Sequence, residues 1–204
     1  MNPLWGWGFC AIGLALFLSS SILAGAVSAP HSTLKPVERR QVKLSIDDFT
    51  LTDQGGNSFQ FKNLRGKVVV VAFAYTTCAD VCPLITAALR QVQSKLSVDE
   101  RKAAYLLTVT TDPQIDSPKV LAGYAKRYGA ELDGWSFLTG SATALKSVWK
   151  NFGVGVKRKG RGVVDHTPLT AIVDRHGVLR FAFIGPSPHV AAVLNDIQSL
   201  LAER

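Results

Sequence analysis

The sequence predicts an α/β domain built on one mixed β-sheet, and three patterns support this fold class. Two apolar runs rich in β-branched residues, 67–76 and 103–109, are typical of strands that are covered on both faces. Apolar residues at helical spacing follow these runs. Near the C-terminus, two further apolar runs flank a short polar turn, as in a β-hairpin. Strands that alternate with helices and end in a hairpin predict a mixed central sheet flanked by helices.

The first 45 residues are expected to precede this domain. Segment 1–29 contains no Lys, Arg, Asp or Glu, and its apolar run is long enough to cross a bilayer as a helix. A retained transmembrane anchor and a cleaved signal peptide are the two alternatives for it. Segment 30–45 is polar, basic and contains prolines, and we expect it to be a tether. The folded domain is therefore expected over 46–204.

The elements of this domain are expected in a simple order along the chain. An N-terminal β-hairpin with a glycine turn comes first, and Ser117 is expected to cap a later helix that has a proline in its first turn. The expected elements are the hairpin 49–61, the strand 67–76, helix 82–96, strand 103–109, helix 117–128, a helix near 141–151, the strands 169–174 and 178–185, and the closing helix 188–203.

The net charge of +8 favours acidic partners or anionic lipid surfaces. No nucleic-acid-binding motif accompanies this charge, so we expect no nucleic-acid partner. The glycine-rich basic segment 153–162 is expected to be a solvated, flexible hairpin tip. Its alternative is a docking surface for an acidic partner, which salt would weaken.

Cys78 and Cys82 are the two cysteines of the folded part, whereas Cys10 lies in the apolar leader. A domain of this size can hold its core together without a disulfide, so the pair is expected to be reactive or metal-binding. Cys78 ends the strongest strand and Cys82 opens the next helix. If the helix begins near Cys78, both sulfurs lie on one face. The positive end of the helix dipole lowers a thiol pKa and favours the thiolate, which is both nucleophile and metal ligand.

Two thiolates and one imidazole form a donor set that suits copper, whereas a structural zinc site would need four protein ligands. His31 lies in the tether, His176 in a hairpin turn and His189 at the start of the last helix. His166 lies just before a central strand and is the candidate third ligand. The alternatives are a turn residue for His166 and a plain disulfide or dithiol for the CxxxC pair.

Asp112 and Asp116 follow the second buried strand, so they are expected at the same sheet edge as Cys78. Loop capping is the expected role of both carboxylates.

Three motifs occur in an order that closely resembles the Sco/SenC family: YTTCADVCPL at 75–84, TVTTDPQIDSP at 108–118 and VDHT at 164–167. The resemblance covers about residues 46–202. It implies a thioredoxin-like fold that binds copper, as Cu(I), Cu(II) or both, through Cys78, Cys82 and His166. It also implies membrane anchoring and a role in maturing the binuclear copper site of cytochrome c oxidase. The implied partner is the copper-site subunit of the oxidase or another copper chaperone.

The sequence departs from this family in two ways. Thr77 and Ala79 stand where many members have His and Pro, and Pro168 is more typical of thioredoxins. The main expectation is a copper metallochaperone. The alternative is a thiol–disulfide oxidoreductase that uses Cys78 and Cys82 as a redox-active dithiol on the oxidase copper site or on a partner chaperone, and a peroxiredoxin-like peroxidase is a third hypothesis.

The resemblance also bears on location. It implies an inner-membrane anchor with the domain in the periplasm, or in the mitochondrial intermembrane space. The basic residues after the leader, such as Lys35 and Arg39, favour the opposite orientation under the positive-inside rule.

Overall fold

Six strands form one mixed sheet in the computed structural model, which describes residues 36–203. In spatial order they are β1 (Glu38–Ser45), β10 (Val178–Ile184), β9 (Leu169–Val173), β4 (Val68–Ala74), β5 (Ala104–Thr110) and β6 (Trp135–Leu138). Strands β4, β5 and β6 are parallel, whereas β9, β10 and β1 are added as antiparallel neighbours. The expected mixed α/β architecture is confirmed.

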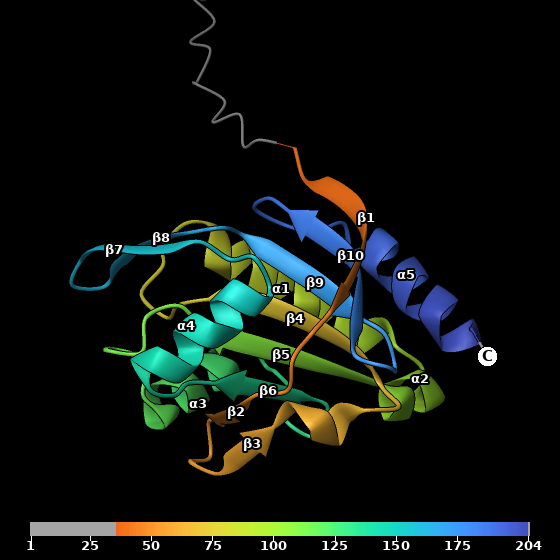
Figure 1. The fold of residues 1–204 in the computed structure, drawn as a ribbon, viewed down its shortest axis with the longest axis horizontal. Coiled ribbons are helices and arrows are strands. Elements are labelled where there is room, and N and C mark those ends of the chain that lie inside the picture. Colours follow the sequence, from red (N-terminus) through yellow and green to blue (C-terminus); the bar gives the residue numbers. More distant parts are fainter. Residues whose placement is uncertain (1–35, 204) are drawn as a thin grey trace, which may run out of the picture. The chain divides into compact units, whose positions relative to one another are not determined.

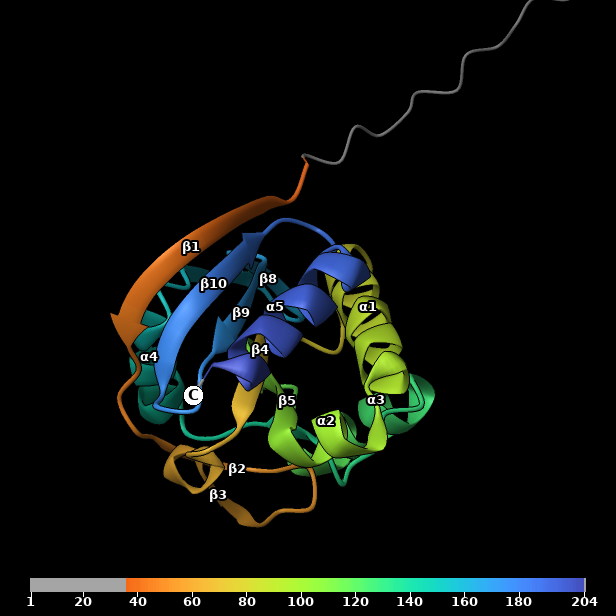
Figure 2. The ribbon, with the colours of Figure 1, turned by 90° about the vertical axis from the view of Figure 1, so that its right-hand side faces the viewer.

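Helices cover both faces of this sheet (Figures 1 and 2). One face packs against α1, α3 and α5, and the other packs against α4. The helices are α1 (Val81–Lys95), α2 (Val98–Ala103), α3 (Pro118–Arg127), α4 (Ala142–Asn151) and α5 (Val190–Ala202), with a short 3-10 helix at Phe61–Leu64. Ser117 and Ser141 cap α3 and α4 by accepting a hydrogen bond from the amides of Val120 and Ala144.

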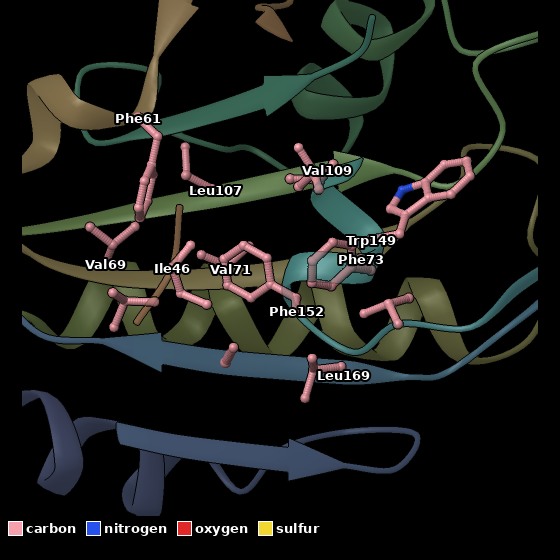
Figure 3. Close-up of a cluster of buried hydrophobic side chains, with 14 of the residues drawn as sticks. Ile46, Phe61, Val69, Val71, Phe73, Leu107, Val109, Trp149, Phe152 and Leu169 are labelled. Atoms are coloured by element: carbon pink, nitrogen blue, oxygen red, sulfur yellow. The ribbon is translucent and has the colours of Figure 1, made fainter. Parts of the chain in front are cut away.

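The alternation of side chains along β4 explains why its sequence is apolar throughout. Val69, Val71 and Phe73 point toward α4, where Figure 3 shows them among Trp149, Phe152 and other large side chains. The intervening residues of β4 point toward α1, α3 and α5. Both faces of the strand are therefore buried, as a strand at the centre of a sheet requires.

Two short hairpins lie outside the main sheet. The expected N-terminal hairpin is confirmed as β2 (Thr50–Thr52) and β3 (Ser58–Gln60), which pair antiparallel. The second hairpin consists of β7 (Val156–Gly160) and β8 (Val163–His166), and Figure 1 shows it extending beyond the end of the sheet. Half of the basic segment 153–162, expected to be a flexible tip, is therefore the paired strand β7.

Residues 38–45 differ from the expectation of a tether over 30–45, because they form the edge strand β1. Its side chains are almost all exposed, so the strand is held by backbone pairing with β10 and by the ion pair of Arg39 with Asp196 of α5 rather than by an apolar face. That kind of pairing leaves no hydrophobic pattern in the sequence. Helix α2 was also not expected, although Ser97 and Glu100 form a capping box at its start.

The membrane prediction for 1–29 lies outside the described residues. Among the helices within 36–203, none has the length and apolarity needed to cross a bilayer.

Candidate metal centre

Cys78 lies in the turn between β4 and α1, and its amide donates to the carbonyl of Tyr75 at 3.3 Å. Cys82 lies in the first turn of α1 and is 0% exposed, whereas Cys78 is half-buried. Helix α1 begins only at Val81, because Asp80 has non-helical angles (φ −117°, ψ −95°). A shared helix face was expected only if the helix began near Cys78, and it does not form. Cys78 instead faces the amides at the N-terminus of α1. Both thiols are free.

The turn that carries Cys78 is fixed to the sheet by Asp116, which is fully buried. Its carboxylate accepts hydrogen bonds from the amide of Thr76 at 3.2 Å and from the hydroxyls of Thr76 and Thr110, both at 2.5 Å. Burial raises the pKa of this carboxyl group above its ordinary value, and the hydrogen bonds oppose the shift. Asp116 thus connects the cysteine turn to the end of β5. It does more than cap its own loop, which was the expected role.

The two thiols have opposite acidities. The pKa of Cys78 is lowered to about 5, mainly because the Cys82 thiol donates a hydrogen bond to its sulfur, with help from the amides of Cys82 and Asp80. The pKa of Cys82 is raised, because it hydrogen-bonds the neighbouring thiolate and is buried. Near neutral pH, Cys78 is therefore a thiolate and Cys82 a thiol. The expected acidifying effect of the helix N-terminus is present at Cys78.

His166 is the last residue of β8, and its ring lies beside both Cys82 and Tyr75. Its Nε2 is 3.6 Å from the Sγ of Cys82, and its Nδ1 is 3.0 Å from the carbonyl oxygen of Thr167. A carbonyl only accepts, so Nδ1 carries the proton and Nε2 presents its lone pair toward sulfur. Burial lowers the pKa of this imidazole, which favours the neutral form that binds metals. The ring of Tyr75 meets it edge-on, with centroids 5.8 Å apart.

The structure therefore brings all three expected residues to one place. Cys78 and Cys82 lie close enough for each to shift the pKa of the other, and Cys82 lies beside the ring of His166. Within 36–203, however, no group of three or more His, Cys, Asp or Glu side chains is already arranged to hold a metal ion. The donor set fits a soft metal ion by its chemistry, two sulfurs and a neutral imidazole, but its side chains are not yet in coordinating positions.

The other candidates lie elsewhere. His176 is exposed in the turn between β9 and β10, and His189 is exposed before α5. His31 and Cys10 lie outside the described residues. Asp112 is buried and forms an ion pair with Arg158 of β7, with 2.6 Å between Oδ1 and Nη1.

Sequence reasoning missed three supporting residues: Tyr75 and Thr77 beside the cysteines, and Arg158 in the hairpin. Thr77 donates from its hydroxyl to the carbonyl of Gly162 in the β7–β8 turn at 3.0 Å. The only sequence signal was that Asp112 and Cys78 were expected at the same sheet edge. This signal does not identify Arg158 of β7 as the partner of Asp112.

The SCO1/SenC family model matches residues 37–202. A relative described as "SCO1 protein homolog" from Bacillus subtilis is 34% identical over 135 residues, which cover 65% of this chain and 69% of the relative.

Two solved structures share both fold and sequence. BsSco, described as a member of the Sco family of cytochrome c oxidase assembly proteins with a disulfide switch, has a TM-score of 0.70 and 26% identity. The match covers 81% of this chain and 98% of BsSco. Yeast Sco1 with copper bound has a TM-score of 0.63 and 27% identity, and the match covers 79% of this chain and 90% of Sco1. The fold is therefore thioredoxin-like, as expected.

Proposed function

Because the chain belongs to the SCO1/SenC family, we propose that Cys78, Cys82 and His166 bind copper and that the domain delivers it during assembly of cytochrome c oxidase. Two relatives support this by their descriptions: yeast Sco1 carries copper in its crystal structure, and BsSco is assigned to oxidase assembly. The proposed recipient is the binuclear copper site of the oxidase, reached directly or through another chaperone.

The observation that carries the proposal is the 3.6 Å approach of His166 Nε2 to Cys82 Sγ. These residues are far apart in sequence and come from different elements, α1 and β8. Nδ1 is directed to the carbonyl of Thr167, so Nε2 is the nitrogen available to a metal. Thiolates prefer Cu(I), and imidazole accepts either oxidation state of copper.

Each residue has a distinct part in this function. Cys78 is half-buried and deprotonated most easily, so it is the first sulfur that an incoming ion or partner thiolate can reach. Cys82 is fully buried and must lose its proton as the metal binds. His166 completes the site from β8. Since the three side chains are not in coordinating positions, copper binding requires a small movement of side chains or of the β7–β8 hairpin.

The decisive experiment measures Cu(I) affinity of the reduced protein by competition with a chromophoric chelator. His166→Ala is expected to weaken binding by about one to two orders of magnitude, the range seen even for residues that only support metal ligands. His176→Ala removes an exposed histidine from a turn remote in sequence from the cysteines and is the matched control, with unchanged affinity. Equal affinities for all three proteins would refute His166 as a ligand.

A second function, thiol–disulfide exchange, is favoured by the unequal acidity of the two thiols. The Cys78 thiolate would attack a substrate disulfide, forming a mixed disulfide and releasing one substrate thiolate. Cys82, once deprotonated, would then attack Cys78, releasing the second substrate thiolate and leaving a Cys78–Cys82 disulfide. The disulfide switch described for BsSco is consistent with such a bond. Reduction of a disulfide substrate that survives His166→Ala but not Cys78→Ser would support this function.

For location, the proposal keeps segment 1–29 as a membrane anchor, with the domain in the periplasm or the mitochondrial intermembrane space. The apolar length of that segment supports it. Protease accessibility of the domain in intact spheroplasts tests the orientation. Protection of the domain there would instead support the arrangement favoured by the positive-inside rule.

A further inference from the structure

An ion pair connects the hairpin that carries His166 to the central sheet. Arg158 of β7 donates from Nη1 to Oδ1 of Asp112 at 2.6 Å, and Asp112 lies just after β5. Arg158 is half-buried, whereas Lys157 and Lys159 on either side of it are exposed. Of the three basic residues in β7, Arg158 is therefore the one that turns toward the body of the domain.

Asp112 makes this contact significant because it is only 1% exposed. Among residues 36–203, the Arg158 guanidinium is the sole hydrogen-bond partner of its carboxylate, and the second oxygen, Oδ2, has none. A buried carboxylate is strongly destabilised when its one counter-charge is removed. The hairpin therefore supplies the positive charge that stabilises the buried Asp112 carboxylate. Moving the hairpin away would expose this carboxylate to solvent or leave it without a partner.

The pairing of β7 with β8 connects Arg158 to the strand that carries His166. Arg158 pairs with Val164, and Val156 pairs with His166 on the opposite strand. A second contact, from the Thr77 hydroxyl to the carbonyl of Gly162, holds the turn of the hairpin against the cysteine loop. The hairpin is thus attached on one side to the residues after β5 and on the other to the residue next to Cys78.

We propose that Arg158 and Asp112 form a positioning pair that holds the β7–β8 hairpin, and with it the imidazole of His166, against the two cysteines. Neither Arg158 nor Asp112 is a metal ligand in this proposal. Their effect on copper rests on the proposed function, whereas their effect on the position of the hairpin does not.

The first test compares Arg158→Met with Lys157→Met. Both substitutions remove one positive charge from β7, but only the first removes a charge that contacts Asp112. Cu(I) affinity of the reduced protein should fall about 10- to 100-fold for Arg158→Met, as for other residues that orient metal ligands. It should change by less than about twofold for Lys157→Met, since exposed charges contribute little. Equal effects of the two substitutions would overturn the proposal.

A double-mutant cycle with His166→Ala shows whether Arg158 acts through the imidazole. If it does, Arg158→Met should not weaken Cu(I) binding further once His166 is absent. A full additional loss in the His166→Ala background would mean that Arg158 acts by another route, and the proposal would be wrong. Arg158→Lys keeps the charge and should restore part of the affinity.

Hydrogen exchange of the metal-free protein provides a readout that does not depend on copper. Arg158→Met should accelerate exchange of the β7–β8 amides at least tenfold relative to Lys157→Met, while amides of β4 and β5 keep their protection. If His166→Ala leaves Cu(I) affinity unchanged, the proposed function fails, but this measurement still decides the positioning role. Unchanged hairpin exchange in Arg158→Met would reject that role even if His166 proved to be a ligand.

The unpaired Asp112 carboxylate of Arg158→Met could prevent folding. The variant that combines Arg158→Met with Asp112→Asn removes both charges and avoids this effect. It should show the same accelerated exchange of the hairpin and the same loss of affinity. Native-like affinity and exchange in this double variant would overturn the proposal.

Discussion

The two sides of the candidate metal centre are built in different ways. The cysteines stand on the central sheet and on α1, where β4 is buried on both faces and Asp116 fixes the turn through three hydrogen-bond donor groups. His166 stands on a hairpin outside the main sheet, whose strands are mostly exposed. The acidity of the thiols is therefore a property of the core, whereas the approach of the imidazole depends on a few contacts at the surface. Four predictions test this contrast.

The largest effect is expected in the core beneath the cysteines. Phe73 of β4 is 0% exposed and packs edge-on against Phe152, with ring centroids 5.4 Å apart. Phe73→Ala should lower the free energy of unfolding by about 3–5 kcal/mol, because it removes buried surface and leaves a cavity. Val163→Ala is the matched truncation in the hairpin, at a side chain that is 54% exposed, and should change stability by less than about 0.5 kcal/mol. Urea unfolding measures both, and similar losses would contradict the contrast.

The second effect is chemical and belongs to the dithiol side. Since the pKa of Cys78 is about 5, its alkylation by iodoacetamide should be half-maximal near pH 5, and Cys82 should react slowly throughout the neutral range. At pH 6 the difference in rate between the two should be at least about tenfold, because only thiolates react. Mass spectrometry of the modified peptides measures it. His166→Ala should leave the ratio nearly unchanged; a strong dependence on His166 would mean that the thiols are not tuned by the core alone.

The same shift predicts how stability depends on pH. Between about pH 5 and the ordinary thiol value of 9.0, native Cys78 is deprotonated while the unfolded chain still holds the proton. The unfolded state then binds more protons, so the free energy of unfolding rises with pH across this window and falls as pH drops through 5. Cys78→Ser should remove that part of the rise.

The smallest effect is expected in the hairpin. Gly162 has φ +71°, and a Cβ there would lie 3.2 Å from both the Thr77 hydroxyl and the Ile115 side chain. Gly162→Ala should therefore cost about 1 kcal/mol and loosen the hairpin locally. Gly160→Ala in the same hairpin meets nothing within 4 Å and is the control. Hydrogen exchange of the hairpin amides compares them, and equal exchange would show that the contact with Thr77 does not hold the turn.

The sequence predicted those parts of the fold that rest on apolar patterns. The strands β4 and β5 and the helix α1 were expected nearly at their observed bounds, because each buries a continuous run or a regular stripe of side chains. Strand β1 was missed, and of the β7–β8 hairpin only a flexible tip was expected, because the side chains of these strands are largely exposed and many are charged. Backbone pairing and a few polar contacts with distant residues hold such strands, and neither has a signature in a single sequence.

The candidate site likewise contains features that the sequence predicted and features that it did not. The convergence of Cys82 and His166 was anticipated from motif order and sheet topology. The roles of Asp112 and Asp116 were not, since their partners Arg158 and Thr76 lie far away in the chain. A carboxylate that links two loops looks the same in the sequence as one that caps its own loop.

The short connection after His166 has a consequence for how the protein matures. Only Thr167 and Pro168 separate the imidazole from β9, and Thr170 of β9 is paired with Ala72 of β4. Slippage of β9 by one residue would turn its buried side chains toward the wrong layer, so this pairing has a single stable alignment. In a newly made chain whose β9 has not yet paired with β4, the sulfurs of Cys78 and Cys82 would lack the nearby imidazole of His166. Under the proposed function, such a chain would bind copper less tightly than a chain that has finished folding.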